Sequence, residues 1–323
     1  MTATAHVYAI AMPTRFRGLT QRQGMVWRGA AGWAEWSPFL DYTGAELVPW
    51  LRAAVETAEV GWPAPVRTEV PVNSTIPAVR PQQAWTMARD AGCATAKVKV
   101  AEPGGSLADD LARVEAVHDA LGPGGRVRVD ANGGWSVDGA FRAVRALDRF
   151  DLEYVEQPCR TVTELADLRR RLARSGRSVQ IAADESIRRV ADPYRVAQLE
   201  AADIAVLKVQ PLGGVRACLE IAERIGLPVV VSSALETSIG LRAGLALAAA
   251  LPDLPYACGL NTRSLLAADL VAEPLRAVAG SISVADLRVE EGLLDQHRAS
   301  PSDENFWQAR LMQTRELAGI GGH

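Results

Sequence analysis

Residues 96–100 read Ala96-Lys97-Val98-Lys99-Val100, and this alternation of apolar residues with lysines predicts a β-strand. Lysine is otherwise nearly absent from the 323-residue chain: Lys208 is the one other lysine, whereas arginine is abundant. An ammonium group can lose its proton when its surroundings lower its pKa, but a guanidinium stays charged. The three lysines are therefore candidates for a role that needs a neutral amine. Chance survival in an arginine-biased composition is the weaker explanation.

Short apolar runs alternate with helical segments on both sides of this strand, and the alternation begins near residue 74. Strands that alternate with helices in this way form a parallel sheet, and eight such strands close into a barrel. We therefore expect an α/β fold, a (β/α)7β TIM-like barrel over residues 74–279, with an open doubly wound sheet as the alternative. The expected strands are 75–79, 96–101, 126–130, 153–157, 179–183, 204–209, 228–233 and 256–260, and the helices are 81–92, 106–121, 136–149, 161–174, 192–201, 213–225 and 238–251.

The segments on either side of the repeat predict a smaller α+β capping domain, built from residues 1–73 and 280–323. It should contain short antiparallel strands at 6–12, 25–29 and 32–36, a helix at 44–60 and a last helix from 301 to about 317. Between the first two strands we expect a loop at 13–24, which is either a solvated connection or a mobile lid. Its lid candidates are Arg15, Phe16, Arg17, Gly18 and Thr20.

The composition excludes several classes of function. A net charge of −3 and a pI near 5.9 argue against a nucleic-acid or membrane partner. Four scattered cysteines without a CxxC motif suggest neither a zinc cluster nor a disulfide framework. Segment 238–251 is apolar but short and carries Arg242, so it should be a buried helix. With no signal peptide pattern at the first residues, we expect a cytoplasmic protein; its oligomeric state is open, and a monomer fits.

Acidic residues stand at the ends of three successive predicted strands: Asp130, Glu156 and Asp184. Catalytic groups of a barrel lie at these C-terminal strand ends, and parallel neighbours are about 4.8 Å apart, so the carboxylates can converge. Three unpaired anions would repel one another. A divalent cation resolves this, and all-oxygen ligation suits Mg²⁺, or Mn²⁺ in its place. Salt bridges to nearby arginines are the alternative explanation.

The lysines flank these acids, with Lys97 and Lys99 on the second strand and Lys208 on the sixth. A lysine that acts as a base must lower its pKa from about 10.4 to about 7–8, and neighbouring cations favour that change. The arrangement indicates removal of a proton α to a carboxylate, with the metal stabilising the enediolate. The substrate should therefore be a small carboxylate.

These motifs together resemble the enolase superfamily, muconate-lactonizing-enzyme subgroup. They are Lys97-x-Lys99, Asp130-x-Asn132, Glu156-Gln157-Pro158, Asp184-Glu185 and Lys208. Within the subgroup, the short length, Arg15-Phe16-Arg17-Gly18, Arg128 and the run 232–238 are most similar to the o-succinylbenzoate synthase family of actinobacterial type. That resemblance implies a Mg²⁺-dependent dehydration of a succinyl-hydroxycyclohexadiene carboxylate, a step of menaquinone synthesis.

The resemblance also implies roles for individual residues. Lys99 would be the base and then return the proton to the departing hydroxyl, Lys208 would face the developing ring as a cation, and Lys97 would support Lys99. Asp130, Glu156 and Asp184 would hold the metal. The substrate contacts would be Arg128, Asn132, Ser232, Ser233 and Gly259, of which Ser232 and Gly259 match positions that hold the succinyl arm.

Other functions stay open at this point. Racemisation of N-acylamino acids or dipeptide epimerisation begins with the same proton abstraction, so the motifs do not separate them well; muconate cycloisomerisation fits the lid and the run 232–238 less well. A Schiff-base aldolase using Lys208 needs only a desolvated amine, but it leaves the three carboxylates unexplained. A barrel kept as a binding or structural protein is disfavoured, because every expected catalytic position is filled.

Overall fold

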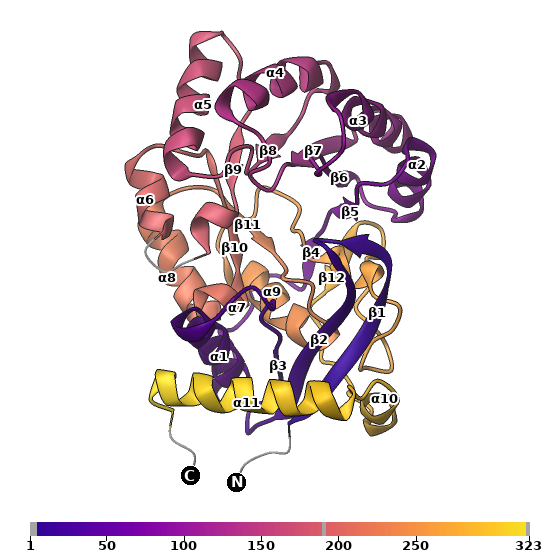
Figure 1. Cartoon of the computed structure of the whole chain (residues 1–323), viewed down its shortest axis with the longest axis vertical. Coiled ribbons are helices and arrows are strands. Elements are labelled where there is room, and N and C mark those ends of the chain that lie inside the picture. The colour runs from indigo at the N-terminus through magenta and orange to yellow at the C-terminus, as the bar shows by residue number, and fades with distance from the viewer. Residues whose placement is uncertain (1–4, 189–191, 321–323) are drawn as a thin grey trace.

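The protein consists of a barrel-like α/β part and a smaller part built from both ends of the chain (Figure 1). The computed structural model describes residues 5–188 and 192–320. The α/β fold with a capping domain, predicted from the sequence, is confirmed. No helix in the described ranges has the length and apolar character that crossing a membrane requires.

Seven parallel strands form the main sheet, in the spatial order β11-β10-β9-β8-β7-β6-β5. The expected eighth strand is reduced to two isolated parallel bridges, Val72 with Cys258 and Ser232 with Gly259, which join the two edges of the sheet. The strands are β5 (Ser74–Ile76), β6 (Thr95–Lys99), β7 (Arg126–Asp130), β8 (Tyr154–Glu156), β9 (Ile181–Ala183), β10 (Ile204–Lys208) and β11 (Val229–Ser232).

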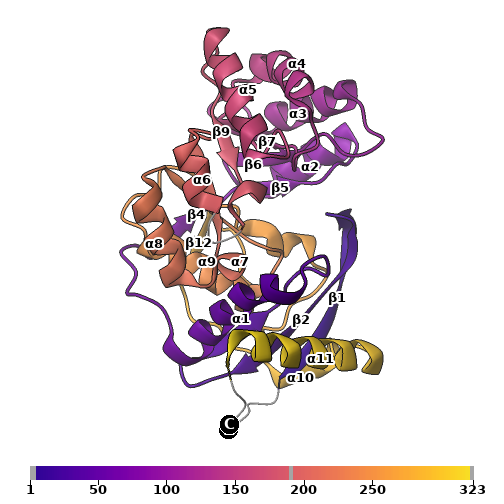
Figure 2. The same cartoon turned by 60° about the vertical axis from the view of Figure 1, so that its left-hand side comes forward.

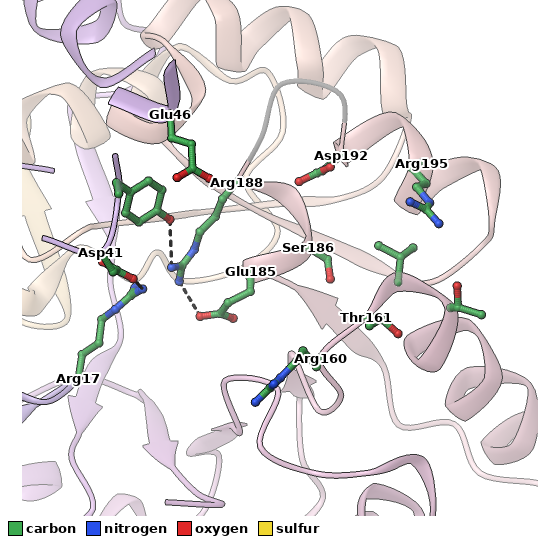
Figure 3. Close-up of a pocket in the computed structure, with 13 residues that line it drawn as sticks. Arg17, Asp41, Glu46, Arg160, Thr161, Glu185, Ser186, Arg188, Asp192 and Arg195 are labelled. Atoms are coloured by element: carbon green, nitrogen blue, oxygen red, sulfur yellow. Dashed lines mark hydrogen bonds and ion pairs between the residues drawn. The ribbon is translucent and has the colours of Figure 1, made fainter. Parts of the chain in front are cut away.

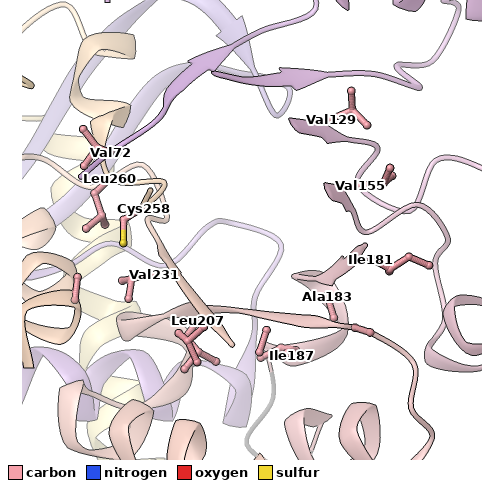
Figure 4. Packing of buried hydrophobic residues seen from close by; sticks show 14 of the residues in the cluster. Val72, Val129, Val155, Ile181, Ala183, Ile187, Leu207, Val231, Cys258 and Leu260 are labelled. Atoms are coloured by element: carbon pink, nitrogen blue, oxygen red, sulfur yellow. The ribbon is translucent and has the colours of Figure 1, made fainter. Parts of the chain in front are cut away.

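Helices cover the outside of this sheet, and the seven expected ones are present. They are α2 (Pro81–Asp90), α3 (Leu107–Leu121), α4 (Val137–Leu147), α5 (Val162–Arg174), α6 (Asp192–Gln198), α8 (Val215–Ile225) and α9 (Ser238–Ala250), with a short additional α7 (Val209–Leu212). Side chains alternate between the two faces of each strand. Val129, Val155 and Ile181 therefore belong to the outer apolar layer (Figure 4), whereas Tyr154 and Ala182 belong to a separate cluster inside the barrel.

The cap contains an antiparallel sheet of β1 (His6–Phe16), β2 (Leu19–Arg28) and β3 (Trp33–Trp36), with α1 (Leu47–Val55) beside it. The expected loop at 13–24 is a hairpin instead. Its strands are joined by Arg17 and Gly18 alone, both at positive φ (51° and 77°), which is the geometry of a tight two-residue turn. Figure 2 shows this hairpin rising from the cap toward the barrel strands.

The C-terminal segment rejoins the N-terminal one, as the sequence predicts. Ala9 N donates to His297 O at 2.9 Å, and Trp307 of α11 (Pro301–Ala318) packs edge-on against Trp36. The helix α10 (Glu291–Gln296) lies just before this contact. In contrast, β12 (Ser281–Ser283) pairs with β4 (Glu69–Pro71), and both pack into the barrel core. We therefore propose that the cap ends before β4 and resumes after β12, in place of the predicted boundaries at 73 and 280.

Candidate active site

Lys99 and two of the acids occupy matching positions on three adjacent strands. Lys99 is the register partner of Asp130 between β6 and β7, and Asp130 is the partner of Glu156 between β7 and β8. Asp184 does not follow this register, because Glu156 pairs with Ala182 and Asp184 lies two residues further along. All three acids nevertheless end on the barrel's inner face, at the C-terminal ends of three neighbouring strands.

Each acid is bonded to a lysine. Lys99 Nζ lies 2.7 Å from Asp130 Oδ2 and also donates to Asn132 Oδ1. Lys97 Nζ lies 2.5 Å from Glu156 Oε1 and 3.5 Å from Asp130 Oδ2. The side chains of both lysines are only 9% exposed. Water therefore competes little for these contacts.

Lys208 reaches the site from β10, on the other side of the acids. Its Nζ lies 2.7 and 2.6 Å from the two carboxylate oxygens of Asp184. Asp184 also accepts a hydrogen bond from Arg188 Nη2 at 3.1 Å. Asp184 is thus bonded to two cations, Lys208 and Arg188. Asp130 and Glu156 are bonded to Lys97 and Lys99.

Burial and these pairings shift the pKa values in opposite directions. Burial alone would raise the pKa of Asp130, but Lys99 and Lys97 outweigh it and lower the pKa to about 2. Arg188 and Lys208 likewise overcome burial and lower the pKa of Asp184. Burial would lower the pKa of Lys97, yet Glu156 and Asp130 raise it. For Lys208 burial prevails, and its pKa is lowered. Burial thus acts on both lysines, but the neighbouring acids outweigh it at Lys97 and not at Lys208.

A small cavity opens between the two groups of lysines. Its volume is about 50 Å³, well below the roughly 300 Å³ at which small-molecule pockets begin. The hairpin covers it, because Phe16 lies 5.2 Å (ring centroid) from Lys99 Nζ. Movement of this hairpin to admit a substrate stays a prediction. The predicted site residues that line this cavity are Phe16, Arg17, Lys97, Lys99, Asp130, Asn132, Asp184, Lys208, Ser232, Ser233 and Gly259.

Gly259 and Ser232 form one wall of the cavity, and their close approach explains the glycine. A Cβ at Gly259 would lie 2.6 Å from Ser232 Oγ, which is closer than real Cβ contacts. Beside them, Ser233 Oγ is 2.6 Å from Thr262 Oγ1. Three predicted lid residues, Arg15, Gly18 and Thr20, do not line the cavity.

Arg128 does not line this cavity, and its contact with substrate stays a prediction. The side chain is fully buried and stacks on Tyr154, with the guanidinium carbon 4.6 Å from the ring centroid. It donates to Glu153, to Asn73 Oδ1 and to Ala257 O. The cause is the register: Arg128 precedes Asp130 by two residues on the same inner face, so it points into the barrel below the mouth.

The acids have the chemistry of a divalent cation site, although their present geometry does not form one. Among the described residues, no group of three His, Cys, Asp or Glu side chains is placed so that it could hold a metal ion, because each acid is bonded to a lysine. Burial raises the pKa of Glu156 to about 7 despite Lys97, and buried Glu185 Oε2 has no hydrogen-bond partner. Both are acidic oxygens that a bound cation would satisfy, and the all-oxygen set of Asp130, Glu156 and Asp184 has the chemistry that a divalent ion prefers.

Comparison with known sequences places this geometry in a family. Residues 81–293 match the family described as "Enolase C-terminal domain-like", and residues 7–58 match "Enolase N-terminal domain-like". The chain belongs to the enolase superfamily. Its curated relatives include o-succinylbenzoate synthase from Thermobifida fusca (strain YX), 60% identical over 97% of this chain and 96% of that protein. The o-succinylbenzoate synthase of Mycolicibacterium smegmatis is 53% identical over 97% of this chain and 95% of that protein.

Solved structures of the enolase superfamily share the fold. Muconate lactonizing enzyme from Pseudomonas putida superposes with a TM-score of 0.77 at 21% identity, over 92% of this chain and 98% of that one. N-succinyl Arg/Lys racemase from Bacillus cereus gives 0.77 at 19% identity, over 93% and 99%. At these identities the likeness concerns the fold alone.

Five residues that line the cavity of this enolase-superfamily site were not among the predicted site residues: Phe39, Thr75, Arg188, Leu235 and Thr262. Arg188 binds both Asp184 and Glu185, and Tyr42 of the cap lies within 3.4 Å of it (Figure 3). Arg188 could have been found from its position four residues after a predicted ligand. Phe39 carries no such signal, because only the packing of the cap on the barrel brings it to the mouth, whereas Leu235 lies in the run 232–238, two residues after Ser233.

Proposed function

We propose that this protein is an o-succinylbenzoate synthase, which removes water from a succinyl-hydroxycyclohexadiene carboxylate. The observation that carries the proposal is the pair Lys99 and Lys208, which face one cavity from β6 and β10 with three carboxylates on the strands between them. This arrangement suits proton removal next to a carboxylate and stabilisation of the anion that forms. The identity to the T. fusca relative, 60% over nearly the full length, selects the substrate.

Lys99 acts first as base and then as acid. Its neutral amine takes the proton on the carbon α to the carboxylate, and the electron pair of that C–H bond enters the carboxylate as an enediolate. When the enediolate collapses, the C–O bond on the neighbouring carbon breaks. The ammonium of Lys99 returns its proton to the departing hydroxyl, so water leaves from the same face. One group can do both because the two steps follow each other at one side of the ring.

Lys208 and Lys97 assist this reaction electrostatically and do not transfer its proton. Lys208 lies across the cavity from Lys99, so its ammonium places positive charge opposite the face that is deprotonated. Lys97 lies between Glu156 and Asp130 and keeps the neighbourhood of Lys99 cationic.

A divalent cation, for which we propose Mg²⁺, would be held by Asp130, Glu156 and Asp184. When bound, such an ion supplies positive charge to the substrate carboxylate as it gains electron density. If Asp130 bound the ion, it would no longer pair with Lys99, and the Lys99 amine would be free for proton transfer. Asn132, Ser232, Ser233 and Gly259 line the cavity and are proposed to contact the substrate. A place in menaquinone synthesis and a cytoplasmic location remain predictions.

The test is a comparison of substrates on one preparation of the purified protein. We expect dehydration of the cyclohexadiene carboxylate, followed by absorbance of the aromatic product, with a far higher kcat/KM than racemisation of N-succinyl amino acids. The second reaction is the rival, because two lysines on opposite faces equally suit removal and return of a proton. A kcat/KM that favours racemisation would overturn the proposal. Activity that survives chelation and is trapped by borohydride would instead indicate a Schiff base on Lys208.

A further inference from the structure

A buried carboxylate of the cap, Glu35 of β3, binds the beginning of a barrel helix. Its Oε2 accepts hydrogen bonds from Thr237 N at 3.1 Å, Thr237 Oγ1 at 2.5 Å and Gly240 N at 3.1 Å, at the start of α9. On the cap side, Oε1 accepts from Tyr8 Oη and Ser37 Oγ, both at 2.7 Å. Glu35 is only 3% exposed. One side chain therefore ties the N-terminal sheet to a helix that lies about 200 residues later in the sequence.

Arg22 of β2 makes a second connection between the same parts. Its guanidinium is 3% exposed and donates to Leu235 O at 3.0 Å and to Ala234 O at 3.1 Å. It also donates to Ser37 O, beside Glu35. Leu235 adopts a positive φ of 62°, which costs a non-glycine residue energy unless its surroundings hold it there. The bonds from Arg22 supply that restraint.

Gln210 joins this network to the strand of Lys208. It follows Lys208 by two residues, accepts from Ser37 N at 3.1 Å and donates to Glu236 Oε1 at 3.3 Å. Glu236 in turn accepts from Ala234 N at 2.6 Å. The loop between β11 and α9 is thus held from the cap by Glu35 and Arg22 and from the barrel by Gln210.

The packing leaves little freedom around Glu35. A Cβ at Gly240 would lie 3.0 Å from Glu35 Oε2 and 2.6 Å from Glu236 Cβ. A Cβ at Gly24 would lie 2.8 Å from Tyr8 Oη, the group that donates to Glu35. Both glycines therefore make room for the carboxylate and its partner. The loop that this carboxylate holds carries Ser233 and Leu235, which line the cavity.

We infer that Glu35 is a positioning residue: it holds the loop of residues 233–237 and thereby sets the wall of the cavity opposite Lys99. The inference rests on the proposed function for its kinetic consequence but not for its structural one. Glu35 touches none of the groups proposed to transfer protons or to hold the metal. Its loss should weaken substrate binding more than it slows the chemical steps.

The decisive variant is Glu35→Gln, because the amide keeps the size but turns an NH2 group toward a set of donors. We expect a KM about tenfold higher with kcat changed less than about threefold, since a displaced wall weakens binding before it affects the reacting groups. Faster hydrogen exchange of the Thr237 and Gly240 amides should accompany it in the substrate-free protein. The matched control is Asp269→Asn, which also removes a buried acid that accepts from α9, at Ser238 N.

Asp269→Asn should lower the melting temperature without raising KM. A wild-type KM in Glu35→Gln, or an equal rise of KM in both variants, would overturn the inference. If Glu35→Gln does not fold, Arg22→Lys takes its place, because lysine keeps the charge but cannot reach both carbonyls; unchanged KM there would also overturn it. If the wild-type protein does not dehydrate the cyclohexadiene, the proposed function fails, and amide exchange still decides the role of Glu35.

Discussion

Lys99 Nζ and Asp130 Oδ2 lie 2.7 Å apart, and the two residues are direct partners in the parallel register of β6 and β7. The proposed base and a proposed metal ligand are therefore held by one pair of strands. A change at one of them alters the other: without Lys99, Asp130 keeps the more distant Lys97 as its ion-pair partner, and without Asp130, Lys99 keeps the neutral Asn132. This coupling determines how variants of the site should be designed.

Lys99→Arg preserves the positive charge beside Asp130 but removes the group that can give up a proton. We expect a folded protein whose dehydration rate falls by about 10²–10⁴-fold, the usual contribution of a general base. Product absorbance measures the rate, and circular dichroism measures folding. Arg170→Lys, on α5, 58% exposed and not part of the cavity lining, is the control and should stay active. Substantial dehydration by Lys99→Arg would refute its role as base.

Asp184→Asn should weaken binding of Mg²⁺ by at least about 100-fold, because losing even an outer partner of a metal ligand costs 10–100-fold. Isothermal titration of the metal-free protein gives the affinity, and dialysis against a chelator should abolish activity until Mg²⁺ is restored. Asp167→Asn is the control, since this acid on α5 is half exposed and does not line the cavity. Equal Mg²⁺ affinity in both variants would exclude Asp184 as a ligand.

Arg128→Met should destabilise the protein without changing KM, because this arginine is bonded inside the barrel and does not line the cavity. Removing one partner of a buried ion pair costs about 3–5 kcal/mol in the free energy of unfolding. Arg126→Met is the matched control: Arg126 lies near the same Glu153 but is 66% exposed, so its change should cost less than about 1 kcal/mol. Urea denaturation measures both. A raised KM in Arg128→Met would support its predicted role as a substrate contact.

Stability should depend on pH through Glu35. Burial, followed by the Glu236 carboxylate, raises its pKa from 4.5 to about 7, although Arg22 opposes the shift; the Tyr8 hydroxyl is its other titratable neighbour. Below about pH 4.5 Glu35 is protonated in both the folded and the unfolded chain. Between about pH 4.5 and 7 it is protonated only in the folded chain. The stability from this group is therefore lost as pH rises through about 7, which amounts to about 2 kcal/mol between pH 5.5 and pH 8.

Urea denaturation of the wild type and of Glu35→Gln at the two pH values isolates this contribution. The variant has no carboxyl at this position, so its loss of stability between pH 5.5 and pH 8 should be smaller by about the same 2 kcal/mol. An equal loss in the two proteins would mean that Glu35 does not titrate in this range.

The sequence predicted the barrel well because its signals are local. Each strand is a short apolar run, and each acid stands at a strand end that can be read from that run. The hairpin of β1 and β2 was missed because residues 13–16 (Pro-Thr-Arg-Phe) show no strand-like alternation, and pairing with β2 extends the strand regardless of their propensity. The eighth strand was overestimated, since an apolar run at 256–260 meets neighbours at only two bridges.

The same contrast between local patterns and long-range packing holds for the site. Lys97, Lys99, Asp130, Asn132, Asp184 and Lys208 meet at one cavity as expected from strand periodicity. Arg128 shares that periodicity, yet depth along the strand takes it to another layer of the barrel. The network of Glu35 and Arg22 was not predicted, because no pattern within the cap indicates which barrel loop it will face.

The restriction of lysine to positions 97, 99 and 208 has a practical consequence. Every side-chain amine in the chain belongs to this one cavity, so a sample grown with ¹⁵N-lysine would report on the site and on nothing else. Its ammonium resonances would separate an amine bonded to a carboxylate from one released by a bound ion. Because lysine occurs at these three positions alone, the lysines can serve as a spectroscopic probe of the site.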